Sequence, residues 1–79
     1  MEQKDVSSTG LQVNVDSANI LKEEGNLLLQ RAKFAAAIEK YSEAISLCPL
    51  SIYYSNRALA HIKMESYGLA LEDSNAAVM

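Results

Sequence analysis

The side chains that most often perform chemistry in enzymes are scarce in this chain of 79 residues. It has one histidine, His61, and one cysteine, Cys48, so the Cys and His ligands of a structural zinc site cannot be assembled. A general base at His61 would need a nucleophile and an orienting group nearby, and the sequence indicates neither. No glycine-rich phosphate loop is found. We therefore expect no catalytic residue, no metal and no cofactor.

Packing and solvation account for the remaining polar and aromatic side chains. His61 is expected at a seam between helices, and Cys48, just before Pro49, is expected to be an inert thiol. The acidic residues are expected on a solvated surface, and three of the four tyrosines fall on packing positions. These acidic residues are Glu39, Glu43, Glu65, Glu72 and Asp73, and the tyrosines are Tyr41, Tyr54 and Tyr67.

Charge and hydropathy exclude two classes of partner. The chain has 7 basic and 10 acidic residues, a net charge of −3, and no basic patch of the kind that binds nucleic acid. Its apolar runs are far too short to span a bilayer, and its polar first residues carry no signal core. A single cysteine without a partner favours a reducing compartment. We expect a cytoplasmic protein, with the nucleus as the second compartment.

The sequence matches itself at a period of about 33 residues, which is typical of stacked supersecondary units. Small residues recur as small ones and large apolar residues as large ones. The pairs are Gly25 and Ala58, Phe34 and Tyr67, Ala37 and Ala70, Ala44 and Ala77, Ile45 and Val78. Within one period the apolar residues follow helical spacing. The sequence therefore predicts an all-α fold of antiparallel helix-turn-helix pairs, with four helices.

The helix limits follow from caps, turns and apolar stripes. We expect helices from about residue 18 to 30, 34 to 47, 51 to 63 or 64, and from 67 onward, with turns at 31–33 and 65–66. Pro49 ends the second helix because it lacks an amide donor and disfavours helical geometry at Cys48. Gly25, inside the first helix, is expected to allow close packing. Tyr54, Ala58 and Ile62 are expected to face inward from the third helix.

Residues 1–16 are expected to form a flexible leader, with Asp16 or Ser17 capping the first helix. Leu11, Val13 and Val15 alternate as in a strand, but the chain offers no second strand to pair with. Residues 17–50 then form a first repeat, and residues 51–79 form a second that is incomplete at its C-terminal end.

Residues 18–79 resemble the tetratricopeptide repeat family, whose helix pairs stack into an α-solenoid. The residues that carry the resemblance are Gly25, Phe34, Ala37, Tyr41, Ala44 and Pro49, with Ala58, Tyr67, Ala70 and Ala77 in the second repeat. The family repeat is one residue longer than the period seen here, and Ser74 stands where the first repeat has Tyr41.

Two segments resemble the carboxylate-clamp subfamily of these repeats, Lys22–Asn26 and Tyr53–Ala58. Carried over by position, that resemblance implies that Lys22, Asn26 and Asn56 bind the C-terminal carboxylate of a chaperone tail. Lys22 and Asn26 are four residues apart and so share one helix face. Tyr53 and Arg57 are further candidate peptide contacts. Arg57 is also the period partner of Glu24, and we expect a salt bridge between them. The Lys and Arg that a third repeat supplies in this subfamily have no counterpart.

Three functions follow from these patterns. The resemblance implies docking of the acidic C-terminal tail of a heat-shock chaperone, of the ninety- or seventy-kilodalton class. The same resemblance extends to repeat modules that precede metal-dependent Ser/Thr phosphatase domains, which would place such a domain or a co-chaperone downstream. The alternatives are self-association as a homodimer, through Leu71 and Val78 on an uncovered fourth helix, and a scaffold for an unrelated peptide.

Overall fold

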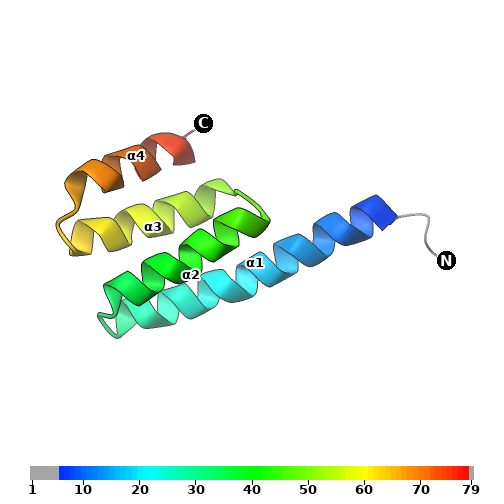
Figure 1. Cartoon of the computed structure of the whole chain (residues 1–79), viewed down its shortest axis with the longest axis horizontal. Coiled ribbons are helices and arrows are strands. Elements are labelled where there is room, and N and C mark those ends of the chain that lie inside the picture. Colours follow the sequence, from blue (N-terminus) through cyan, green and yellow to red (C-terminus); the bar gives the residue numbers. More distant parts are fainter. Residues whose placement is uncertain (1–5, 79) are drawn as a thin grey trace.

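The computed structural model of the chain describes residues 6–78, with side chains from residue 14 onward. It consists of four helices, α1 (Val6–Gln30), α2 (Phe34–Leu47), α3 (Ser51–Lys63) and α4 (Tyr67–Ala77), shown in Figure 1. Short turns join α1 to α2 and α3 to α4 as antiparallel pairs. The predicted all-α fold of tetratricopeptide-like helix pairs is confirmed, as are the ends of α1, α2 and α3 and the start of α4.

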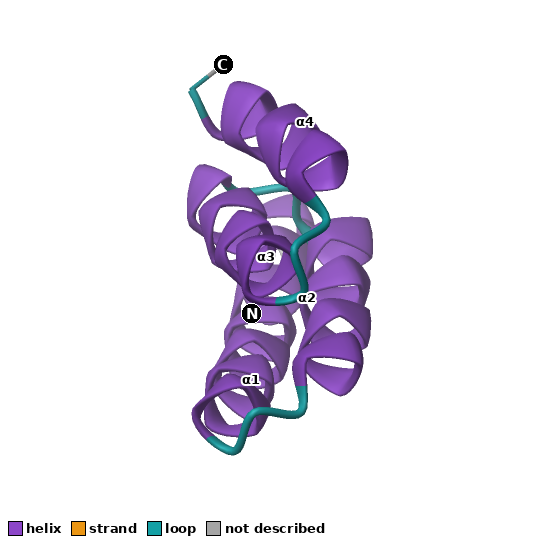
Figure 2. Ribbon diagram, turned by 90° about the vertical axis from the view of Figure 1, so that its left-hand side faces the viewer, coloured by secondary structure: helices purple, strands orange, loops and turns teal. Residues whose placement is uncertain are grey.

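The two helix pairs stack into a slab of 49 × 27 × 12 Å. The α2 helix packs against α3 between the pairs, and α1 also contacts α3. Viewed roughly along the helix axes, α3 lies above α1, with α2 beside them (Figure 2). The first half of α1 extends beyond the other helices (Figure 1). Side chains on equivalent faces of α1 and α3 are thereby brought to one surface.

The turns after α1 and α3 have the same geometry and are separated by the repeat period. Ala32 and Glu65 both have left-handed backbones, with φ of 61° and 62°. In each turn the amide three residues beyond the last helical residue bonds back to a carbonyl of the last turn, from Lys33 to Leu28 at 2.9 Å and from Ser66 to His61 at 2.8 Å. This pattern closes a helix end with its carbonyls satisfied. The two turns set the same antiparallel geometry in both pairs.

The α2 helix ends at Leu47, as predicted from Pro49. Cys48 has an extended backbone, and its amide bonds to the carbonyl of Ala44 at 2.9 Å. The Cys48 thiol is buried and free, in agreement with a packing role.

The core consists of small side chains and two fully buried tyrosines. Gly25 lies against the ring of Tyr41, because a β-carbon added at Gly25 would come within 2.6 Å of that ring. The predicted packing role of Gly25 is therefore confirmed. The buried residues form two clusters, the first of Ala18, Ala44, Cys48 and Tyr53, the second of Ala37, Tyr41 and Ala60.

The expected leader is the clearest difference between sequence and structure. Residues 6–16 are helical, so Asp16 and Ser17 lie inside α1 and do not cap it, and Leu11, Val13 and Val15 belong to a helix. Val15 packs against the first core cluster, which extends order N-terminal to Ala18. A helix that is already packed adds further residues at little cost, and no proline interrupts this one. Residues 1–5 of the expected leader lie outside the described residues.

The surface differs from expectation at a few apolar positions. Tyr67 and Ile62 were predicted to pack inward, but both are exposed, because no described element covers those faces of α3 and α4. Leu71 and Val78 are 63% and 83% exposed, as predicted for an uncovered fourth helix. None of the helices described has the length and apolar character needed to span a membrane.

Candidate functional site

The first repeat and the second repeat meet at two asparagines on the shared face of α1 and α3. The Nδ2 of Asn56, on α3, donates a hydrogen bond to Oδ1 of Asn26, on α1, at 3.3 Å. Both asparagines are half-buried. The two asparagines are 30 positions apart in the sequence, and the stacking of the helices brings them into contact.

Lys22 completes this group of three, which we call the Lys-Asn-Asn cluster. It lies one helical turn before Asn26 on the same face of α1. Its side chain is half-buried, and no hydrogen bond or ion pair within residues 14–78 engages its ammonium group. A cation beside two amides is suited to an anion with two oxygens, such as a carboxylate.

The Asn26 amide is hydrogen-bonded to Tyr41 on its core side. The Tyr41 hydroxyl donates to Oδ1 of Asn26 at 2.6 Å, so this oxygen accepts from both Tyr41 and Asn56. Burial raises the pKa of Tyr41 above its ordinary value of 10.0. This contact was not anticipated from the sequence, where Tyr41 was expected only to pack.

Tyr53 does not belong to an accessible site. The prediction that it contacts a peptide is wrong for this structure, because its side chain is fully buried in the first core cluster. Its hydroxyl donates to Oδ1 of Asn19 at 2.6 Å. Burial raises the pKa of Tyr53, and the negative charge of a Cys48 thiolate would raise it further. Tyr53 is thus a core residue with a satisfied hydroxyl.

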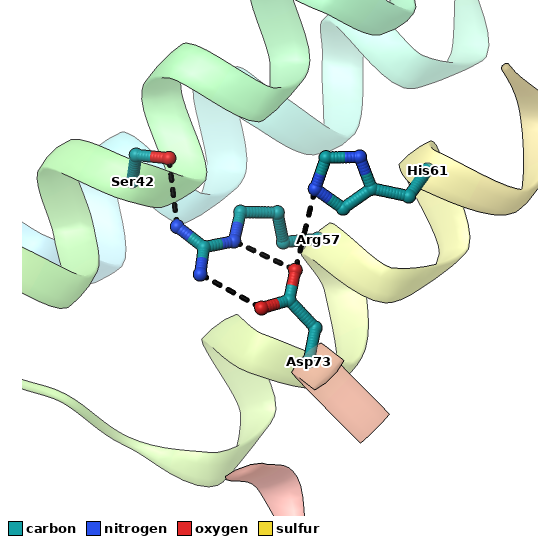
Figure 3. Close-up of polar contacts among 4 residues, drawn as sticks. All are labelled: Ser42, Arg57, His61 and Asp73. Carbon is teal, nitrogen blue, oxygen red and sulfur yellow. Dashed lines mark hydrogen bonds and ion pairs between the residues drawn. The ribbon is translucent and has the colours of Figure 1, made fainter. Parts of the chain in front are cut away.

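Arg57, the other candidate peptide contact, is engaged in a partly buried network, drawn in Figure 3. Its Nε and one terminal nitrogen donate to the two oxygens of Asp73, each at 2.8 Å. The other terminal nitrogen donates to Oγ of Ser42 at 2.9 Å, and the guanidinium carbon lies 5.6 Å from the centre of the Tyr54 ring. The hydrogen bonds with Asp73 raise the pKa of Arg57, and burial opposes them. Arg57 joins α2, α3 and α4.

The predicted salt bridge between Arg57 and Glu24 is therefore wrong. Glu24 instead pairs with Lys40, at 3.3 Å between Oε1 and Nζ, with side chains 50% and 36% exposed. Asp73, expected at the surface, is only 6% exposed. The two ion pairs are related by the repeat period: Glu24 corresponds to Arg57, and Lys40 to Asp73. At both positions the charge has the opposite sign in the second repeat, so the acid and the base of each pair are exchanged together. This exchange is the sequence signal that would have identified both ion pairs.

His61 is buried beside the same carboxylate, with Nε2 3.4 Å from Oδ2 of Asp73 (Figure 3). The packing position predicted for His61 is confirmed. Among the residues described, no group of three or more Cys, His, Asp and Glu side chains could hold a metal ion, and no pocket is enclosed. The Lys-Asn-Asn cluster thus lies on an open face of a helical-repeat fold.

Comparison with known proteins supports that class, although no family model matches the chain. It is 44% identical over 66 residues to the mitochondrial import receptor subunit TOM34 of Rattus norvegicus, covering 82% of this chain and 21% of that protein. It is 40% identical over 62 residues to the small glutamine-rich tetratricopeptide repeat-containing protein 2 of Saccharomyces cerevisiae, covering 77% and 18%.

A third relative is an enzyme by name. The chain is 53% identical over 45 residues to the serine/threonine-protein phosphatase T of Saccharomyces cerevisiae, covering 56% of this chain and 9% of that protein. The chain spans about a fifth of the length of the first two relatives. Together with the helix pairs, these matches show that the chain is similar to proteins that contain tetratricopeptide repeats.

Proposed function

We propose that this chain is a docking module that binds the C-terminal carboxylate of an acidic peptide through the Lys-Asn-Asn cluster. The observation that carries the proposal is the 3.3 Å contact between Asn26 and Asn56, on the face of α1 that also carries Lys22. The Lys22 ammonium supplies charge, and the two amides supply oriented donors. Such a group satisfies both oxygens of a terminal carboxylate.

The partner proposed is the tail of a heat-shock chaperone of the ninety- or seventy-kilodalton class, ending in Glu-Glu-Val-Asp. This follows from the resemblance of Lys22, Asn26 and Asn56 to the carboxylate-clamp subfamily. A charge-assisted hydrogen bond contributes about 1.5–3 kcal/mol, so three ligands support at best about micromolar affinity once association costs are subtracted. We place the complex in the cytoplasm, and the nucleus second.

The role proposed for the whole protein is recruitment of a catalytic or co-chaperone partner to the chaperone. The match to phosphatase T favours a Ser/Thr phosphatase as that partner. The stretches Tyr53–Ala60 and Glu65–Leu71, the second with its Tyr-Gly pair, also resemble the N-terminal repeat module of protein phosphatase 5. The chain itself is proposed to be a binding module without catalytic residues.

Calorimetric titration with a Met-Glu-Glu-Val-Asp peptide tests this proposal. Lys22→Ala and Asn56→Ala should each weaken binding about tenfold or more, because each removes a ligand to the carboxylate. The matched controls are Lys40→Ala, which removes a lysine on α2, and Asn75→Ala, which removes an exposed asparagine on α4. Equal affinity of all four variants and the wild type would contradict the proposal.

Self-association is a second candidate function, favoured by the exposed Leu71 on α4 and Val78 just beyond its end. A dimer formed through this face predicts a molecular mass that rises with protein concentration, and loss of that rise in Leu71→Glu. Lys22→Ala would leave it unchanged. Light scattering over a hundredfold range of concentration separates the two functions, and a constant monomer mass would exclude the dimer.

A further inference from the structure

The oxygen of the Asn26 amide has no remaining capacity to bind a ligand. A carbonyl oxygen has two lone pairs, and Oδ1 of Asn26 accepts from Tyr41 at 2.6 Å and from Asn56 at 3.3 Å. Rotating the amide by half a turn would break both bonds and point its N–H groups at two donors. The oxygen is therefore fixed inward, and the two N–H groups of Asn26 are left for the accessible side.

The Tyr41 side chain, which donates to Asn26, is fixed by its packing in the core. Tyr41 is fully buried in the second core cluster, packed with Ala37 and Ala60. Its ring lies so close to Gly25 that even a β-carbon there would come within 2.6 Å of it. The hydroxyl is thus placed by the core packing of the first repeat, and its position does not depend on a ligand.

The same residues are replaced together in the second repeat. The repeat period relates Gly25 to Ala58, Asn26 to Leu59 and Tyr41 to Ser74. Where the ring is absent, the glycine beneath it and the asparagine that its hydroxyl bonds are absent as well. A tyrosine that served packing alone would require the glycine but not the asparagine. The set of Gly25, Asn26 and Tyr41 therefore behaves as one unit in the repeat that carries the site.

We infer that Tyr41 is a positioning residue, whose hydroxyl fixes the Asn26 amide so that only N–H groups face the bound anion. The inference rests on the proposed function for the identity of that anion, a terminal carboxylate. Asn56 is oriented in turn, because one of its N–H groups is committed to Asn26. The surface then offers an ammonium group and amide donors, with no amide oxygen of Asn26 to repel a carboxylate.

The test compares two fully buried tyrosines whose hydroxyls bond different asparagines. Tyr41→Phe removes the bond to Asn26, and Tyr53→Phe removes a 2.6 Å bond from an equally buried tyrosine to Asn19, outside the cluster. Affinity for Met-Glu-Glu-Val-Asp should fall about three- to tenfold in Tyr41→Phe, the range expected for one lost hydrogen bond, and remain unchanged in Tyr53→Phe. Equal affinities of the two variants would overturn the inference.

Side-chain amide signals in the ligand-free protein test the orientation independently of binding. In Tyr41→Phe the signals of Asn26 and Asn56 should shift, and in Tyr53→Phe the signal of Asn19 should shift instead. Unchanged Asn26 signals in Tyr41→Phe would overturn the inference even if the peptide binds. If the wild type fails to bind the peptide, the proposed function fails, and these signals alone decide whether Tyr41 orients Asn26.

Discussion

Replacing Gly25 by alanine should destabilise the protein, although alanine is the better helix former. The added β-carbon would lie 2.6, 2.8 and 3.0 Å from three ring atoms of Tyr41. Carbon atoms pack best at about 3.5–4.0 Å, so the ring must move by about 1 Å. Overpacking of this kind costs about 1–3 kcal/mol, and the helix propensity returns about 1 kcal/mol. We expect a net loss of up to about 2 kcal/mol.

Gly68→Ala is the matched control, because a β-carbon at Gly68 meets nothing within 4 Å. It lies in the first turn of α4 and should stabilise the protein by up to about 1 kcal/mol. Urea unfolding followed by circular dichroism measures both variants. With a slope of about 1 kcal/mol per molar urea, the midpoint should fall by up to about 2 M in Gly25→Ala and rise in Gly68→Ala. A rise in both would refute the packing argument.

Three further predictions follow from the core. Asp73→Ala leaves the Arg57 guanidinium without its carboxylate and should lower the free energy of unfolding in urea by about 2–4 kcal/mol. This is less than for a fully buried pair, because the Arg57 side chain is 22% exposed. A loss below about 1 kcal/mol would show that the pair is a surface interaction. Burial raises the pKa of Tyr41 and Tyr53 in the folded protein above 10.0. The stability that the protonated hydroxyls contribute is therefore complete below pH 10 and is lost as the pH rises through the pKa values of the folded state. The free energy of unfolding, measured from pH 8 to 11.5, should fall in this way, and a constant value would contradict the argument. The buried Cys48 thiol should react with a thiol reagent only as fast as the chain unfolds, and rapid reaction under native conditions would contradict its burial.

The helices were largely predictable, because local signals define their ends. Pro49 ends α2, the turns at 31–33 and 65–66 recur at the repeat period, and the small and large apolar positions repeat with them. The N-terminal part of α1 was not predictable in this way. Ser7, Ser8, Thr9 and Gly10 are weak helix formers, and the helical state of residues 6–16 depends on continuation from a helix that tertiary contacts already hold.

The site was predictable only in part, for a physical reason. The position of Lys22, Asn26 and Asn56 on one face follows from helical spacing and stacking, and the structure brings the two asparagines into contact. Which buried polar groups pair depends on packing between helices, which a linear pattern does not specify. Tyr53 and Arg57 were therefore assigned to the peptide, although the first is a core residue and the second bonds Asp73.

Titration of the isotope-labelled protein with Met-Glu-Glu-Val-Asp, followed by amide signals, tests the central claim most directly. The same peptide with an amidated C-terminus is the control. We predict saturable shifts around Lys22, Asn26 and Asn56 with the free carboxylate and none with the amidated peptide. The absence of shifts in a well-dispersed spectrum, or equal shifts with both peptides, would contradict a carboxylate-binding role for this cluster.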